Sequence, residues 1–360
     1  MAQIRNILLF MSICLIGANW AGNRGIQQVS GPFLIDFEPS RRSPPGKTVR
    51  AVKHFALRNF FEAAAPPGAS RRPSSRTHPK LAMATQRIPE AALLGSIDSD
   101  IQTLQRDGIV AHKGAFPREF IEQMREDMMT AFWEAIQHPG RAVSRGPRRW
   151  YVEVHPQAIS GFTGMVTHPW FVAMCESVLG PEYKIVEIGF DTPFQGAKIQ
   201  PWHRDFPSPA ESYIEHRITS LAFNLTGVDV TEDMGPFEIA PGTQWDDGRT
   251  WNHQMFPSEE LWPRFEELGV RKFPKMGDIS CRSALTVHRG TPHASPVARP
   301  VLVLGVDAPG AGHEELHDLM VTQDFYSSLP AQVREHLICR VVDKLVPVTQ
   351  KHDIEGLVMG

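Results

Sequence analysis

Residues 200–206 read Gln-Pro-Trp-His-Arg-Asp-Phe and contain the pair of side chains on which the predicted fold and site depend. In an extended segment, residues two apart point to the same side of the chain. His203 and Asp205 therefore present an imidazole and a carboxylate next to each other. These groups are two of the three ligands in a 2-His-1-carboxylate triad, which holds non-haem Fe(II) and leaves coordination positions open. A His-x-Asp pair is common by chance, so a third ligand must come from elsewhere in the chain.

A second histidine lies at the end of a predicted strand further along the chain. We expect Ser283–Val287 to be a strand that leads to His288, and Val301–Val306 to be the next strand, opened by Arg299. On neighbouring strands, His288 and Arg299 can face one cavity. A planar guanidinium suits a carboxylate because it donates two charge-assisted hydrogen bonds. His293 follows in a turn that contains proline and is the alternative third ligand, but a strand end is the more rigid mount.

Several motifs accompany the His-x-Asp pair. They are Pro201–Asp205, Asn224–Val228, Glu232–Pro236, Ala240–Thr243, and His288–Gly290 with Ser295 and Arg299. Together they resemble the phytanoyl-CoA dioxygenase family of Fe(II)- and 2-oxoglutarate-dependent oxygenases, over roughly residues 96–345. The resemblance implies that His203, Asp205 and His288 are the iron ligands. It also implies that Arg299 binds the distal carboxylate of 2-oxoglutarate, and that Fe(II), 2-oxoglutarate and O₂ are required.

Two positions depart from the pattern of that family. Gln244 follows the Ala240–Thr243 motif, where the family usually has a histidine, and Gly290 stands where some relatives have a serine that helps to hold the co-substrate. Neither position belongs to the predicted triad. The second contact to the co-substrate is therefore left unidentified by the sequence.

The composition is that of an ordinary globular protein. The chain has 360 residues, of which 42% are hydrophobic and 21% charged, and its formal net charge is −3. This balance argues for no polyanionic partner such as a nucleic acid. The four cysteines are scattered and form no Cys-x-x-Cys pair, which fits a reducing compartment. No segment reaches the ~20 apolar residues that a membrane-spanning helix needs.

Residues 1–88 differ from the rest of the chain. An apolar run over Ile7–Ala18 matches the core of a signal peptide better than a membrane span. The residues after it are rich in Arg, Ser and Pro and poor in acidic residues, which predicts disorder. A signal peptide, an organellar transit sequence and an upstream extension before a working start at Met83 are the three interpretations. We prefer the third and expect a cytoplasmic enzyme, because 2-oxoglutarate is an intracellular co-substrate.

An oxygenase domain is predicted over residues 96–345, followed by a tail over residues 346–360. Helices are expected from Ser96 to Gly108, from Pro117 to about Gln137, over His168–Leu179 and over Leu329–Leu345. Strands are expected at Ile109–Ala111, Tyr183–Phe190, Ile218–Asn224 and Phe237–Ala240, besides the two named above. Helices followed by short strands indicate an α+β fold, with a double-stranded β-helix (jelly roll) core and buttressing helices.

Two segments are candidates for substrate contacts. The stretch from Gln244 to Lys275 carries Trp245, Trp251 and Trp262 and is predicted to be an insertion that forms a lid or a binding loop. Its aromatic content suggests an apolar or polycyclic substrate held by few charges. The run Arg148–Tyr151 either lines the substrate mouth, by the resemblance, or forms a solvated loop.

A zinc-site motif competes with this interpretation. His313-Glu314-Glu315-Leu316-His317 fits H-E-x-x-H, in which two histidines one helical turn apart bind zinc and the glutamate acts as a base. It directly follows a glycine-rich segment, and no long helix is predicted to carry it. A zinc protease and a non-catalytic jelly-roll binding protein are therefore the alternatives to the preferred function. That function is a 2-oxoglutarate-dependent dioxygenase that oxidises, most simply by hydroxylation, a small organic substrate and releases succinate and CO₂.

Overall fold

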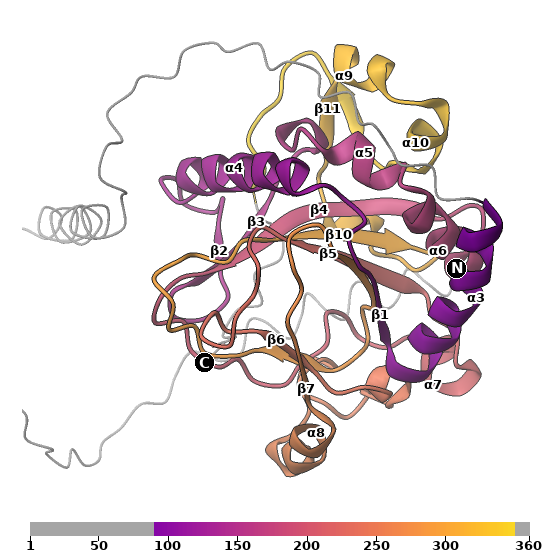
Figure 1. Cartoon of the computed structure of the whole chain (residues 1–360), viewed down its shortest axis with the longest axis vertical. Coiled ribbons are helices and arrows are strands. Elements are labelled where there is room, and N and C mark those ends of the chain that lie inside the picture. Colours follow the sequence, from indigo (N-terminus) through magenta and orange to yellow (C-terminus); the bar gives the residue numbers. More distant parts are fainter. Residues whose placement is uncertain (1–89, 350–360) are drawn as a thin grey trace, which may run out of the picture. The chain divides into compact units, whose positions relative to one another are not determined.

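The computed structural model describes residues 90–349 (Figure 1). The predictions for residues 1–88 and for most of the tail lie outside the described residues. Four helices come before the long strand β4 (Lys184–Pro193): α3 (Glu90–Asp107), α4 (Arg118–Ala135), α5 (Phe162–Val166) and α6 (Pro169–Leu179). The first begins six residues before the predicted Ser96. It ends as predicted at Gly108, whose φ of 73° is a left-handed conformation that glycine adopts without strain.

Helix α4 shows why these segments are helical. Its apolar residues recur every three to four positions, so they form one face that packs against the sheet. Phe120, Met124, Met128 and Phe132 lie on this face and are all buried. This face belongs to the main hydrophobic core, which also contains residues of α3, α5 and α6.

A seven-stranded antiparallel sheet runs in the order β1-β8-β5-β10-β4-β3-β2. Its strands are β1 (Ile109–His112), β2 (Val143–Ser144), β3 (Arg149–Glu153), β4 (Lys184–Pro193), β5 (Ser220–Thr226), β8 (Ile279–Ser283) and β10 (Val301–Asp307). In Figure 1, α4 and α5 lie along one face of this sheet, whereas β6 and β7 lie on the opposite side. Helices therefore cover one face of the large sheet, and the other face is turned toward the strands of a second sheet.

Successive side chains along each strand of the large sheet point to opposite faces. On β10, Leu302 and Leu304 belong to the core beneath the helices, whereas Val303 and Gly305 line a pocket on the other face. On β8, Cys281 points to the core and Arg282 lines the pocket. The same strands thus build the core with one set of residues and the pocket wall with the other.

A second sheet closes the pocket, with β7 (Val270–Lys272), β6 (Phe237–Ile239) and β9 (His288–Gly290) paired antiparallel in that order. Two antiparallel sheets that enclose one pocket, with helices behind the larger sheet, confirm the predicted α+β jelly roll. Helix α7 (Ala210–Glu215) lies between β4 and β5, and α8 (Trp262–Leu268) lies between β6 and β7. Short 3₁₀ turns follow β3, β6 and β10.

The strand predicted over Ser283–Val287 is wrong. The strand is β8, which ends at Ser283, and the chain turns before His288 begins β9. The residues of this turn are buried, and two of them, Ala284 and Val287, hydrogen-bond through their backbone N–H groups to Ser220 O and Thr243 Oγ1. A short apolar run is typical of a buried strand, but here it forms a buried turn, which the sequence alone does not distinguish.

The long C-terminal helix predicted over Leu329–Leu345 is also wrong. Helix α10 covers only Ala331–His336, after α9 (Gln323–Ser328), and β12 (Arg340–Val342) then pairs in parallel with β11 (Met320–Thr322). Val341, which lies within the range predicted to be helical, is 41% exposed. The β-branched pair Val341-Val342 joins a strand instead of continuing the helix.

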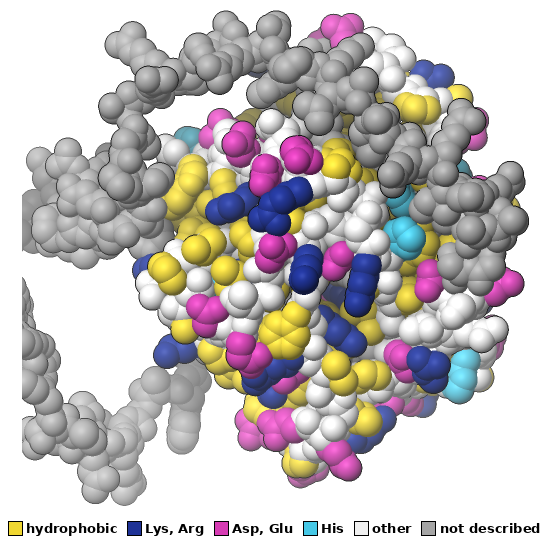
Figure 2. Space-filling view, in the orientation of Figure 1, with side chains coloured by type: hydrophobic (Ala, Val, Ile, Leu, Met, Phe, Trp, Pro, Cys, Tyr) yellow, Lys and Arg dark blue, Asp and Glu magenta, His cyan; other side chains and the backbone are white. Residues whose placement is uncertain are grey.

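Over residues 90–349, no helix is both long and apolar enough to cross a lipid bilayer. Figure 2 shows that basic and acidic side chains lie intermixed on the face of the described part that it presents.

Candidate active site

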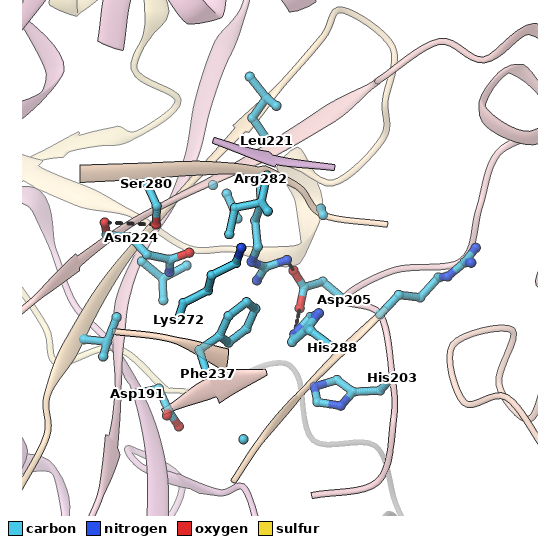
Figure 3. Close-up of a pocket in the computed structure, with 18 of the residues that line it drawn as sticks. Asp191, His203, Asp205, Leu221, Asn224, Phe237, Lys272, Ser280, Arg282 and His288 are labelled. Atoms are coloured by element: carbon cyan, nitrogen blue, oxygen red, sulfur yellow. Dashed lines mark hydrogen bonds and ion pairs between the residues drawn. The ribbon is translucent and has the colours of Figure 1, made fainter. Parts of the chain in front are cut away.

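The three predicted metal ligands come together in the structure. One ligand atom from each of His203, Asp205 and His288 lies within 4.8 Å of the others. His288 Nε2 is 3.4 Å from Asp205 Oδ1, and the two imidazole centroids are 4.5 Å apart. Figure 3 shows the three side chains converging on one side of the pocket. His203 and Asp205 lie outside the named strands, so their common direction comes from a locally extended loop.

A backbone pairing holds this loop to the second sheet. His203 and His288 exchange two hydrogen bonds, with N···O distances of 3.0 and 2.8 Å, in an isolated antiparallel bridge. Directly opposite residues in such a pair bring their side chains to the same face. The Asp205 N–H donates to Ala284 O at 3.1 Å and fixes the other end of the loop. The bridge therefore determines the spacing of the two imidazoles.

Each imidazole is oriented by a backbone carbonyl. His203 Nδ1 donates to Pro201 O, and His288 Nδ1 donates to Thr286 O, both at 2.9 Å. A carbonyl can only accept, so the proton lies on Nδ1 and the Nε2 lone pair is left for a metal. His293, the alternative ligand, has Nδ1 2.6 Å from Met234 O and Nε2 2.9 Å from Val297 O. Both of its nitrogens therefore face carbonyls, which favours His288 as the third ligand.

The surroundings of the cluster favour neutral histidines and an ionised aspartate, the forms that bind a metal. Burial lowers the pKa of His203 to about 4 and lowers the pKa of His288 well below its usual range. Burial alone would raise the pKa of Asp205, but the charges of Arg282 and His288 outweigh it and lower that pKa to about 2. Two neutral imidazoles and one carboxylate are the form that binds a divalent ion at neutral pH.

These residues fit an Fe(II) site. Two imidazole nitrogens and one carboxylate oxygen are the donors of the facial triad, and both histidines carry the second hydrogen bond typical of metal ligands. Phe256 lies beside His203, with centroids 5.8 Å apart, and Phe237 lies 5.0 Å from His288. These rings give the three side chains an apolar boundary.

Arg299 lies in the same pocket, two residues before β10. It is 5% exposed, and its Nε donates to Met234 O at 2.9 Å. Burial, together with the charge of the nearby Arg149, lowers the pKa of Arg299 to about 10, so the side chain remains a cation at neutral pH. The structure thus places a buried guanidinium in the pocket that contains the triad.

The pocket is a cavity of about 920 Å³ between the two sheets. Lys272, Asn224 and Arg282 lie on its wall together with Phe237 (Figure 3). Further apolar lining comes from both sheets and from the 244–275 segment: Ile109, Val230, Met255, Phe256, Val270, Phe273, Val301 and Val303. The wall therefore combines an apolar surface with several charges, and the expectation of a substrate held by few charges stays a prediction.

The tryptophans of the 244–275 segment serve a structural purpose. Trp251 and Trp262 pack in a small second core with Trp202 and Phe265, and Trp245 packs against the main core. None of the three lines the pocket. The segment contributes to the pocket through Met255, Phe256 and the strand β7 instead.

The H-E-x-x-H stretch does not form the helix that a zinc site requires. Its middle residues make a single 3₁₀ turn, Glu314–Leu316. His313 Nδ1 is 3.1 Å from an Asp307 carboxylate oxygen, and His317 Nδ1 is 3.2 Å from Glu153 Oε2. Each histidine is thus paired with a different buried carboxylate, and the metal-like cluster within the described residues is the one around His203.

Sequence reasoning missed Arg282. Its Nη1 lies 2.6 Å from Asp205 Oδ2, and its guanidinium lies 5.6 Å from the centre of the Phe237 ring. A charged residue between Cys281 and Ser283 in a buried strand was the available signal. The run Arg148–Tyr151, left as either a substrate mouth or a solvated loop, is mostly the buried strand β3, and its Arg149 and Tyr151 line the pocket.

Comparison with known proteins identifies the family of this chain. A family model described as phytanoyl-CoA dioxygenase (PhyH) matches residues 104–301, more than half of the chain. No curated protein sequence matches the chain. Among solved structures, the epimerase SnoN in complex with Fe³⁺, alpha ketoglutarate and nogalamycin RO matches with 17% identity and a TM-score of 0.48, covering 61% of this chain and 92% of that one. From the family match, the chain belongs to the phytanoyl-CoA dioxygenase family and is an oxygenase that uses non-haem Fe(II), 2-oxoglutarate and O₂.

Proposed function

We propose that His203, Asp205 and His288 bind the Fe(II), that Arg299 binds the distal carboxylate of 2-oxoglutarate, and that the enzyme hydroxylates a small organic substrate with an apolar body. The observation that carries this proposal is the convergence of the three ligand atoms within 4.8 Å, inside the cavity that also contains Arg299. An intracellular location follows from the need for 2-oxoglutarate.

The bound iron, co-substrate and O₂ supply the oxidation of an unactivated C–H bond. One oxygen atom enters the substrate as a hydroxyl group and the other enters succinate, while 2-oxoglutarate loses CO₂. The protein contributes orientation and exclusion of water. His203 and His288 direct Nε2 toward the metal, Asp205 supplies the negative charge, and the surrounding rings limit the entry of water.

The shape and lining of the cavity support a substrate larger than the co-substrate alone. Ligand cavities of ~300–1,000 Å³ accommodate drug-sized molecules, and this one holds about 920 Å³. The apolar residues on its wall suit a hydrocarbon or ring body, such as an apolar or polycyclic metabolite. The charged Lys272 and Arg282 on the same wall suit a polar group on that molecule.

Anaerobic titration tests the ligand assignment. Fe(II) and 2-oxoglutarate added to the full chain should give the weak visible charge-transfer band of a chelated co-substrate. His288→Ala should abolish the band and Arg299→Ala should weaken it, while His313→Ala should leave it intact. Tightly bound zinc that is lost in His313→Ala, with no band in the parent protein, would instead support the zinc-protease alternative.

Substrate oxidation is tested separately by succinate release. A panel of apolar carboxylic acids, polycyclic compounds and small zwitterions should raise succinate formation only for compounds with an apolar body, and mass spectrometry should show a gain of one oxygen atom. Stimulation by small zwitterions alone would contradict the proposed substrate class. A product that has lost two hydrogens without gaining oxygen would contradict hydroxylation.

A further inference from the structure

A half-buried lysine on the small sheet lines the cavity. Lys272 is on β7, and Figure 3 shows its side chain directed into the pocket. Within residues 90–349, its ammonium group makes no hydrogen bond and no ion pair. The adjacent Arg271, by contrast, pairs with Glu238 and Glu232. An ammonium group that faces a cavity without a partner is a candidate binding group for an anion.

The charges around Lys272 leave its ammonium group without a carboxylate of its own. The carboxylate whose charge acts on it is Asp107. Both oxygens of Asp107 already accept hydrogen bonds from Arg106, at 2.7 Å each. Burial lowers the pKa of Lys272, and the charge of Asp107 offsets only part of this effect. An anion bound in the cavity would therefore stabilise the charged form of Lys272.

A polar side chain of the large sheet faces the same cavity. On β5, Phe223 and Leu225 point to the core, whereas Asn224 between them lines the cavity. The side-chain amide of Asn224 has no hydrogen-bond partner among the described residues. In Figure 3, Asn224 and Lys272 both point into the part of the pocket away from His203. An ammonium group and an amide N–H can each donate to one oxygen of a carboxylate.

The strand pairing of the small sheet sets the distance between Lys272 and the triad. Lys272 is opposite Phe237 on β6, and Phe237 is opposite Gly290 on β9, the strand that begins at His288. Neighbouring strands are ~4.8 Å apart, so Lys272 lies about 10 Å across the sheet from β9. The Phe237 ring is 5.0 Å from the His288 ring. A substrate with an anionic group at Lys272 would therefore lay its apolar body across Phe237 toward the triad.

Acidic residues on the cavity wall limit the charge of such an anion. Asp107 and Asp278 both line the cavity. The two oxygens of Asp278 accept hydrogen bonds from the backbone N–H groups of Gly114 and Lys275, at 2.9 Å each, so this carboxylate is held in place. Fixed carboxylates repel a dianion more strongly than a monoanion. The surroundings of Lys272 therefore favour a carboxylate over a phosphate group.

We propose that Lys272 and Asn224 bind a carboxylate group of the primary substrate, which is therefore an apolar organic acid. Lys272 provides the ion pair, and Asn224 donates a hydrogen bond from its side-chain amide. This inference rests on the proposed function and narrows its substrate class. It assigns the carboxylates of the substrate and of 2-oxoglutarate to different cations, Lys272 and Arg299.

The test compares carboxylic acids with the primary amides of the same acids. Decanoate, 2-naphthoate and adamantane-1-carboxylate are the probes, and calorimetry measures the binding of each acid and amide to the full chain loaded with Mn(II) and 2-oxoglutarate. The parent protein should bind at least one acid about 10-fold more tightly than its amide, the size of effect expected for a hydrogen bond to a charged group. Lys272→Met should remove this preference and leave the affinity for the amide nearly unchanged. Decyl phosphate should bind more weakly than decanoate.

Lys275→Met is the matched control, because Lys275 is exposed and absent from the cavity wall. It removes the same charge from the same segment and should keep the preference for the acid. Asn224→Asp puts a second carboxylate next to the bound acid at nearly constant side-chain size. It should weaken binding of the acid without weakening binding of the amide. The affinity of Lys272→Met for 2-oxoglutarate, measured by the charge-transfer band with Fe(II), should equal that of the parent protein.

The outcomes separate this inference from the function on which it rests. Binding of no acid, equal binding of acids and amides, or a preference that survives Lys272→Met would overturn the role of Lys272, while the band in the parent protein upholds the iron site. Tighter binding of decyl phosphate than of decanoate would overturn the assignment to a carboxylate. Loss of 2-oxoglutarate affinity in Lys272→Met would assign this lysine to the co-substrate instead. No band in the parent protein would overturn the proposed function and this inference together.

Discussion

Arg282 Nη1 lies 2.6 Å from Asp205 Oδ2, and the other oxygen of the same carboxylate, Oδ1, lies 3.4 Å from His288 Nε2. The ion pair therefore selects which oxygen of Asp205 is turned toward the histidines. Arg282 belongs to β8 in the large sheet, whereas His288 belongs to β9 in the small one. One carboxylate thus connects the two sheets at the metal site.

Replacing Arg282 tests this arrangement. Arg282→Met keeps the length of the side chain and removes its charge, so Asp205 loses the partner that orients it. We expect metal affinity to fall ~10–100-fold, the usual cost of losing an outer-shell partner of a metal ligand. Co(II) titration measures the affinity without turnover. Arg264→Met removes a half-exposed arginine that pairs with Asp246 and should not change the affinity. Equal affinities for Arg282→Met and the parent protein would contradict the role of the ion pair.

Metal binding should persist to unusually low pH. Protons compete with a metal only below the pKa of each ligand, and here those values are about 4 for His203 and about 2 for Asp205. We expect the affinity for Mn(II) to stay constant from pH 8 to about pH 5 and to fall near pH 4. An ordinary histidine site would begin to lose its metal near pH 6.5. A decline that begins there would show that the imidazoles are not desolvated in solution.

Gly290→Ala should destabilise the protein through Arg149. The added Cβ would overlap the guanidinium, and overpacking of this kind costs ~1–3 kcal/mol in the free energy of unfolding. In the Arg149→Ala background the overlap is gone, so the same substitution should cost much less. Urea unfolding of the parent protein, the two single variants and the double variant gives the coupling free energy between the two substitutions. Additive effects would mean that the two residues do not share this space.

The apolar face of α4 should be a major source of stability. Met128 is fully buried, so Met128→Ala should lower the free energy of unfolding by ~2–5 kcal/mol, the range for large-to-small core substitutions. Glu126 is exposed on the same helix, and Glu126→Ala should change stability by less than ~0.5 kcal/mol. Chemical denaturation of both variants measures the difference. Similar effects would indicate that α4 does not pack by this face.

His317 should stabilise the protein more at low pH than at high pH. Burial alone would lower its pKa, but the hydrogen bond to Glu153 and the charge of Glu187 outweigh burial and raise it. A raised pKa in the folded state gives stability that is complete below the unfolded value of ~6.5 and is lost as pH rises through the folded value. His317→Gln should therefore cost more stability at pH 6 than at pH 9. A constant difference across this range would contradict a charged His317–Glu153 pair.

Short local patterns were enough to predict much of the site and of the fold. His203 and Asp205 are two residues apart, and the regular apolar spacing of Phe120, Met124 and Met128 depends only on helical geometry. His288 and Arg299 were chosen with the help of the family resemblance, since the strand predicted to lead to His288 is wrong. These features depend on neighbours in the sequence.

The features that sequence reasoning missed depend on partners far away in the chain. Arg282 is significant only because the fold places it against Asp205, and Arg149 only because Gly290 leaves space for it. The tryptophans of the 244–275 segment suggested a binding surface, yet Trp251 packs under Arg204 in a small core. Composition alone does not distinguish an aromatic residue that supports a loop from one that lines a pocket.

The backbone bridge between His203 and His288 also bears on how the enzyme acquires its metal. These residues are distant in sequence, so a long loop must close before their backbones can pair. An incompletely folded chain therefore has no paired imidazoles with which to retain iron. If these residues hold the iron as proposed, metal binding would report that this part of the chain has folded.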